Sequence, residues 1–93
     1  MHPDVILLDI SLPGISGIEA ARRIREVSPE SRIVFVSQHD SIRMAKDALG
    51  VGGCGYVVKS DAGRDLLAAI DAAHAGRMFV SRTLVARGWI LNN

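Results

Sequence analysis

Residues 5–25 read VILLDISLPGISGIEAARRIR, and this stretch decides the fold. The apolar run Val5 to Leu8 ends at a single carboxylate, Asp9, and a Pro13-Gly14 turn leads into a segment with helical spacing. An unbroken apolar run is typical of a strand that is covered on both faces, as in a parallel sheet. Asp9 then lies at the carboxyl end of the strand, where open α/β sheets bind their ligands. The plainer alternative is that Asp9 only ends the strand and is solvated in a loop.

The same pattern repeats twice along the chain. Further strands are predicted at Arg32–Ser37 and Tyr56–Lys59, which are rich in β-branched and aromatic residues. A helix is predicted after each strand. The first runs from Ser16 to about Val27, with Ser16 and Glu19 as a capping box, and the second is capped by Asp40 or Ser41. The third is capped by Asp61 and ends near Gly76, and its buried stripe consists of Leu66, Leu67, Ile70 and Ala73. The βαβαβα order predicts an α/β fold with three parallel strands and three helices.

The chain gives weaker signals after Gly76. Residues 78–80 suggest a short extended piece, and residues 84–91, which include Trp89, are apolar enough to pack against the domain. We predict one domain over residues 1–81 and assign no structure to residues 82–93.

Composition limits the classes of protein to consider. A chain of 93 residues allows one small domain, and 11 basic against 10 acidic residues give no electrostatic reason to bind nucleic acid or an anionic membrane. Cys54 is the single cysteine, so an internal disulfide is excluded. No apolar run is long enough to span a membrane, and no signal peptide is evident. We expect a cytoplasmic protein that binds neither DNA nor membranes.

Three chemically useful residues stand at the three predicted strand ends: Asp9, Ser37 and Lys59. Because parallel strands finish at the same edge of a sheet, we expect a carboxylate, a hydroxyl and an ammonium group to meet there. An aspartate can accept a phosphoryl group, whose charge a lysine and a hydroxyl can then balance. Taken singly, Lys59 could instead extend its stem over the surface, and Ser37 could bond to the local backbone.

The motifs resemble the receiver domain of two-component response regulators of the LuxR/NarL type over about residues 3–81. The residues that carry the likeness are Asp4-Val-Ile-Leu-Leu-Asp9, Pro13 and Gly17, Ser37-Gln-His-Asp40, Gly55-Tyr-Val-Val-Lys-Ser-Asp61 and Asp65-Leu-Leu-Ala-Ala-Ile70. The resemblance implies a flavodoxin-like fold, a histidine kinase as partner, and a role in phosphorelay signalling and transcription regulation, not an enzyme.

The resemblance also implies individual roles. Asp9 would be the phosphoacceptor, Ser37 the switch hydroxyl, Lys59 its cationic partner and Tyr56 the aromatic switch residue. Asp9 and the backbone carbonyl of Ser11 would be ligands of Mg²⁺.

The chain also departs from the family, whose five strands lie in the order 2-1-3-4-5. It begins at the equivalent of the third strand, so the first two strands, the first helix and an acidic pair that helps to bind magnesium are missing. Since Mg²⁺ takes about six oxygen ligands, we expect its binding to be weak or absent and phosphorylation to be slow or absent.

The truncation leaves the strand Val5 to Leu8 as an exposed edge. We expect two copies to associate through this edge, or the C-terminal segment with Trp89 to cover it. Two readings of function follow: a signalling module with Asp9 as phosphoacceptor, or an interaction and dimerisation module that is not phosphorylated. A small hydrolase or nucleotide-binding protein is disfavoured, because no glycine-rich phosphate loop follows the first strand.

Overall fold

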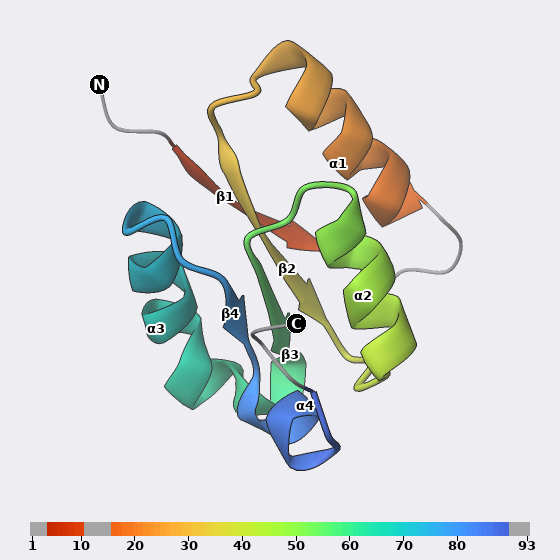
Figure 1. Ribbon diagram of the computed structural model, residues 1–93, viewed down its shortest axis with the longest axis vertical. Coiled ribbons are helices and arrows are strands. Elements are labelled where there is room, and N and C mark those ends of the chain that lie inside the picture. The colour runs from red at the N-terminus through yellow and green to blue at the C-terminus, as the bar shows by residue number, and fades with distance from the viewer. Residues whose placement is uncertain (1–3, 11–15, 90–93) are drawn as a thin grey trace.

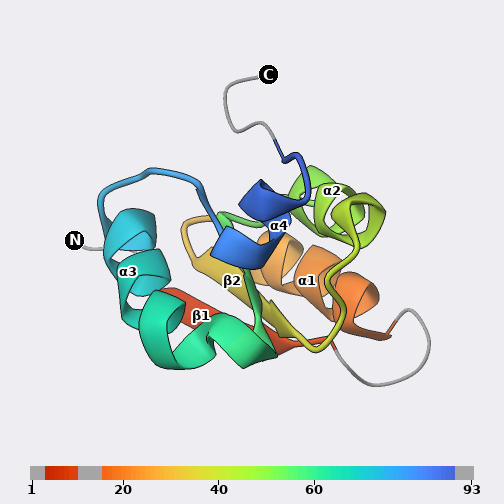
Figure 2. The same cartoon turned by 90° about the horizontal axis from the view of Figure 1, so that it is seen from below.

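The alternation of apolar runs and helical segments produces a parallel sheet covered by helices on both faces (Figures 1 and 2). The structure is a computed structural model that describes residues 4–10 and 16–89, with only the backbone described at residues 16–18. The elements are β1 (Val5–Asp9), α1 (Ser16–Val27), β2 (Arg32–Ser37), α2 (Ile42–Gly50), β3 (Gly55–Val58), the 3-10 turn η1 (Lys59–Asp61), α3 (Ala62–His74), β4 (Phe79–Val80) and α4 (Arg82–Ala86). The predicted α/β receiver-like fold is confirmed.

The sheet has four strands in the order β1-β2-β3-β4, all parallel, so the predicted number of three was wrong. The additional strand, β4, pairs with Gly55 and Tyr56 of β3. A strand of two residues is too short to show an apolar alternation, which is why the pattern gave only a weak extended signal there. The short helix α4 then follows, within the region for which the sequence predicted no structure.

Two central strands carry most of the core. β3 is buried at every position, and β2 is buried at four of its six positions, as expected for strands covered on both faces. Helices α1 and α2 lie over one face of the sheet and α3 over the other (Figures 1 and 2). β1 lies at an edge and is less well covered, and Leu7 in its middle is 46% exposed.

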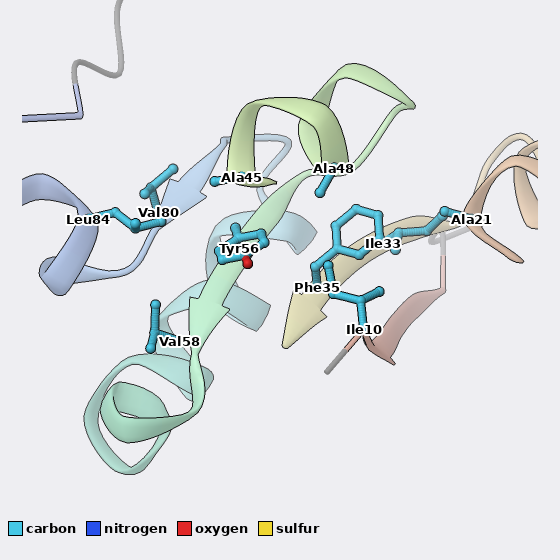
Figure 3. Close-up of a cluster of buried hydrophobic side chains, with 10 residues drawn as sticks. All are labelled: Ile10, Ala21, Ile33, Phe35, Ala45, Ala48, Tyr56, Val58, Val80 and Leu84. Carbon is cyan, nitrogen blue, oxygen red and sulfur yellow. The ribbon is translucent and has the colours of Figure 1, made fainter. Parts of the chain in front are cut away.

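The larger core cluster lies between the sheet and the α1/α2 layer. Figure 3 shows Phe35 and Tyr56 projecting from neighbouring strands toward Ala45 and Ala48 of α2. Small side chains on the helix let it approach the bulky residues of the strands closely. The other members are Ile10, Ala21, Ile33, Val58, Val80 and Leu84. The opposite face has a smaller cluster of Val34 and Val57 against Ala69 and Ala73 of α3.

The buried stripe of α3 differs from the prediction. Leu67 is 75% exposed, whereas Ala69, Ala72, Ala73 and the carboxylate residue Asp65 are buried. Apolar spacing placed Leu67 in the stripe, but the sheet contacts α3 through its alanines. The predicted stripe is therefore correct at Ala73, which is buried, and wrong at Leu67, while Leu66 and Ile70 are partly buried.

Two predicted helix starts have different outcomes. Ser41 is the N-cap of α2, and its hydroxyl accepts a hydrogen bond from the Met44 N–H at 3.3 Å. Asp61 occupies the N-cap position of α3 but makes no capping bond there. Its carboxylate instead accepts hydrogen bonds from the Ser81 hydroxyl and from the Thr83 N–H. The side chain of Ser16, the Pro13-Gly14 turn and Ser11 lie outside the described residues.

The predicted alternative that Trp89 covers the first strand is wrong for the part of the chain that the structure describes. The main-chain N–H of Trp89 donates a hydrogen bond to the Leu84 carbonyl at 3.0 Å, and this bond holds Trp89 beside α4. Its ring packs partly buried against the larger core cluster. α4 follows β4, at the opposite side of the sheet from β1 (Figure 1).

Candidate functional site

The site lies at the carboxyl edge of the parallel sheet. Asp9 is the last residue of β1, Ser37 is the last residue of β2, and Lys59 directly follows β3. The strand register pairs Asp9 with Val36 and Ser37 with Val58, so each of the three positions is offset by one residue from the next along the sheet edge. β3 ends at Val58, one residue earlier than predicted, because Lys59 begins the η1 turn.

The structure brings Asp9 and Lys59 into direct contact. Lys59 Nζ lies 2.9 Å from Asp9 Oδ2, and the two side chains are 45% and 52% exposed. An ion pair with this exposure adds only about 0–1 kcal/mol to stability. Its significance is therefore chemical: a carboxylate that solvent can reach is held beside a compact cation.

Ser37 is turned into the protein. Its side chain is fully buried, and its hydroxyl accepts a hydrogen bond from the His39 N–H at 3.0 Å. This is the local backbone contact that the plainer interpretation of Ser37 predicted. This hydrogen bond also joins the Ser37 hydroxyl to the main chain of the loop that follows β2.

Tyr56 is linked to the same loop. Its ring is fully buried in the larger core cluster (Figure 3), and its hydroxyl donates to the His39 carbonyl at 3.0 Å. Burial raises the pKa of Tyr56; the neighbouring Ser37 hydroxyl opposes this effect, and the Asp40 charge adds to it. Tyr56 is therefore a neutral donor near pH 7. The main chain of His39 connects Ser37 to Tyr56, a link that reasoning from side chains missed.

The described residues do not form a complete magnesium site. Receiver domains generally bind Mg²⁺, which needs about six oxygen ligands. Within residues 4–10 and 16–89, no group of three or more His, Cys, Asp or Glu side chains could hold a metal ion. Asp9 supplies one carboxylate at this edge, while Asp4 lies at the other end of β1. Ser11, the other predicted ligand, lies outside the described residues.

A second polar cluster, which the sequence did not predict, adjoins the Lys59 turn. Asp65 accepts hydrogen bonds from Arg82 N at 3.1 Å and Arg82 Nε at 3.2 Å, and its side chain is only 5% exposed. Asp61 accepts from Thr83 N at 3.1 Å and from the Ser81 hydroxyl. Two carboxylates from η1 and α3 thus hold the start of α4.

The Asp61 carboxylate is stabilised in its ionised form. Burial alone would raise the pKa of Asp61, but hydrogen bonds from Ser81 and Thr83 and the charge of Arg82 outweigh it and lower that pKa below its ordinary value of 3.8. Because Asp61 is two residues beyond Lys59, the same turn carries the site cation and the anchor of α4.

Comparison with known proteins identifies the family. The sequence matches the family described as the response regulator receiver domain over residues 1–71. The chain belongs to this family. It is 39% identical over 84 residues to the nitrate/nitrite response regulator protein NarL of Escherichia coli strain K12, and 34% identical over 85 residues to the transcriptional activator protein ExaE of Pseudomonas putida. These matches cover 90% and 91% of this chain but only 39% and 40% of the relatives.

Solved structures agree with this assignment. A LuxR-family two-component response regulator from Aurantimonas sp. SI85-9A1 matches with a TM-score of 0.81 and 37% identity, covering 89% of this chain and 59% of that one. The isolated receiver domain of RcsB from Salmonella enterica serovar Typhimurium, solved with phosphomimetic BeF3-, matches with a TM-score of 0.74 and 25% identity, covering 88% of this chain and 62% of that one. This receiver domain therefore spans about two fifths of its curated relatives.

Proposed function

We propose that this chain is a receiver module of two-component phosphorelay signalling in which Asp9 is the phosphoacceptor. The observation that carries the proposal is the 2.9 Å contact between Lys59 Nζ and Asp9 Oδ2 at the carboxyl edge of the sheet. The partner would be a phosphorylated histidine kinase, as the family implies.

The chemistry requires one bond to form and one to break. A carboxylate oxygen of Asp9 attacks phosphorus, and the bond between phosphorus and the imidazole nitrogen of the kinase phosphohistidine breaks. The electron pair remains on the imidazole nitrogen, which takes a proton from water. The acyl phosphate formed at Asp9 carries nearly two negative charges, and Lys59 is positioned to balance part of this charge.

The response would pass through Ser37 and Tyr56. A phosphoryl group on Asp9 offers acceptor oxygens to the Ser37 hydroxyl, which in this structure accepts from the His39 N–H. If Ser37 turns toward the phosphoryl group, it leaves that contact, and the His39 loop that also holds Tyr56 can rearrange. Tyr56 is the switch residue in this proposal because it joins the loop to the core.

The rate of transfer should be slow, because the described residues bring a single carboxylate to this edge and no step here depends on a bound metal. The test is intact-mass analysis after incubation with a phosphorylated histidine kinase, or with acetyl phosphate and Mg²⁺. We expect slow addition of one phosphoryl group, abolished in Asp9→Asn and reduced in Lys59→Met, with Lys46→Met as the matched control. Addition that persists in Asp9→Asn would overturn the assignment, and rapid stoichiometric addition would contradict the expected slow rate.

The wider setting is also a proposal. The matched relatives include a transcriptional activator and a nitrate/nitrite response regulator, so we propose that this module serves the control of transcription. It would not act as an enzyme on a separate substrate, and it would act without binding DNA itself. None of the described helices is long and apolar enough to cross a bilayer. The free thiol of Cys54 suits the reducing cytoplasm, where we place the protein.

The second candidate function is an interaction module that associates with itself and is not phosphorylated. One observation favours a chain that is not phosphorylated: among the described residues, no group of three or more His, Cys, Asp or Glu side chains could hold a metal ion. Absence of Asp9-dependent labelling from either phosphoryl donor would favour this function over the first.

A further inference from the structure

Helix α4 is bonded at both of its ends to segments that carry part of the site, and it lies at the end of the sheet where β2 and β3 finish (Figure 1). At the beginning of α4, the Asp61 carboxylate accepts hydrogen bonds from the Ser81 hydroxyl and from Thr83 N, the latter at 3.1 Å. Asp61 lies in the η1 turn, which begins at Lys59. The start of α4 is therefore fixed to the segment that supplies the site cation.

The end of α4 is bonded to the loop between β2 and α2, which directly follows Ser37. Arg87 is the C-cap of α4, and its Nη2 atom lies 2.8 Å from Asp40 Oδ2. The residue before Asp40 is His39, whose N–H donates to the Ser37 hydroxyl and whose carbonyl accepts from the Tyr56 hydroxyl, each at 3.0 Å. One short loop thus connects the Ser37 hydroxyl, the buried tyrosine and the end of α4.

The two attachments of α4 differ in how firmly they hold the helix. At the beginning, Asp65 adds a buried carboxylate that accepts from Arg82 N at 3.1 Å. At the end, the Arg87 and Asp40 side chains are 58% and 46% exposed, and ion pairs with this exposure are weak. Just beyond, Trp89 buries its indole N–H without a hydrogen bond in the described part of the chain, which is unfavourable. The end of α4 is therefore the part that can be released.

We propose that phosphorylation of Asp9 releases the end of α4 by opening the Asp40–Arg87 ion pair, while the beginning of α4 stays attached. The trigger rests on the proposed function, in which Ser37 turns toward the phosphoryl group and leaves the His39 N–H. The loop between β2 and α2 then loses the bond that fixes its first residues, and Asp40 moves away from Arg87. The η1 turn keeps its cation beside the acceptor, so the start of α4 has no reason to move.

A coupling of this kind acts in both directions. If phosphorylation weakens the contact at the end of α4, then loss of that contact favours the phosphorylated form by the same factor. A single exposed ion pair limits this factor to about two- to fivefold. The link also exists in the unphosphorylated protein, because Asp40 directly follows His39. Breaking the ion pair from the Arg87 side should therefore loosen the His39 N–H without any phosphoryl group.

The experiment is amide hydrogen exchange of the complete 93-residue chain, followed residue by residue by nuclear magnetic resonance. Without a phosphoryl donor, Arg87→Met should raise the exchange rate of the His39 amide about two- to fivefold. Asp40→Asn removes the opposite charge and should have the same effect. The matched control Arg77→Met replaces an exposed arginine before β4 and should leave the His39 amide unchanged.

The trigger is tested at the end of α4, where the Gly88 amide donates to the Val85 carbonyl at 3.1 Å. After treatment with acetyl phosphate and Mg²⁺, we expect the Gly88 amide to exchange faster in protein labelled at Asp9, while the Thr83 amide keeps its rate. Ser37→Ala removes the acceptor of the His39 N–H and so imitates the trigger without phosphorylation. It should also speed the Gly88 amide, and an unchanged Thr83 amide shows that the variant is folded.

Three results would overturn the inference. They are a His39 amide that neither Arg87→Met nor Asp40→Asn affects, a Gly88 amide that Ser37→Ala does not affect, and a chain labelled at Asp9 whose Gly88 amide exchanges as before. The last result leaves the proposed function standing. Absence of labelling contradicts the proposed function instead, and faster exchange of Gly88 in unlabelled Ser37→Ala would still support the link between the loop and α4.

Discussion

Replacing Asp65 by alanine tests whether the start of α4 is held by a buried carboxylate. The Asp65 side chain is 5% exposed and accepts from Arg82 N at 3.1 Å and Arg82 Nε at 3.2 Å, with Arg82 Nη2 also 3.2 Å away. The substitution removes all of these contacts at once. Asp61 still accepts from Thr83 N, so α4 keeps one anchor.

The loss in the free energy of unfolding depends on how exposed each group bonded to Asp65 is. A hydrogen bond to a charged group contributes about 1.5–3 kcal/mol when the partner cannot return to water. The Arg82 side chain is 57% exposed, so its guanidinium regains hydration and its ion pair contributes about 0–1 kcal/mol. Most of the loss therefore comes from the main-chain N–H of Arg82. We expect Asp65→Ala to lower the free energy of unfolding by about 2 kcal/mol.

The assay is urea unfolding followed by far-ultraviolet circular dichroism and by Trp89 fluorescence, since Trp89 is bonded to α4. Arg82→Ala keeps the main-chain N–H and should cost less than about 1 kcal/mol. Asp71→Ala, at an exposed position on the same helix, is the matched control and should stay within about 0.5 kcal/mol of wild type. The reasoning is refuted if Asp65→Ala behaves like Asp71→Ala, or if Arg82→Ala costs as much as Asp65→Ala.

Three further predictions concern other parts of the molecule. The pKa of Asp61 is lowered below 3.8 in the folded protein, so its ionised form stabilises the fold above pH 3.8. This contribution is lost as the pH falls through the folded pKa. Asp61→Asn should therefore reduce the dependence of the free energy of unfolding on acid pH. A Cβ at Gly53 would collide with the buried Phe35 ring, so Gly53→Ala should lower the free energy of unfolding by about 1–3 kcal/mol. Gly63 in α3 has open space around it, so Gly63→Ala should raise the free energy of unfolding by about 0.5–1 kcal/mol. Thermal unfolding measures both changes. Tyr56→Phe removes one hydrogen bond to a main-chain carbonyl and should cost about 0.5–1.5 kcal/mol in the same assay, and an unchanged melting temperature would show that this bond is not stabilising.

The parallel sheet could be predicted because its central strands are covered on both faces. Such strands consist of continuous β-branched and aromatic residues, which the sequence shows directly at residues 33–36 and 56–58. The contact between Asp9 and Lys59 could be anticipated for a related reason. Parallel neighbouring strands must finish at the same edge, so residues at their ends are brought together whatever their separation along the chain.

Other features depend on tertiary contacts that a one-dimensional pattern does not contain. Asp65 and Asp71 both lie on α3, but only the first is buried, because α4 packs against that side of the helix. Leu67 has the spacing of a core residue and is exposed because the sheet contacts the alanine face of α3. Its exposure is decided by how the helix is rotated on the sheet, which apolar spacing sets only to within about a third of a turn.

The most direct test of the central claim is zero-length carbodiimide crosslinking followed by peptide mass spectrometry. The reagent joins a carboxylate to an amine only where the two are in contact, with loss of one water. We expect an amide between Asp9 and Lys59 as the main intramolecular crosslink of Lys59, and we expect it to be absent from Asp9→Asn. Crosslinks of Lys59 only to other carboxylates would contradict the account, because Asp9 and Lys59 would then not share the carboxyl edge of the sheet.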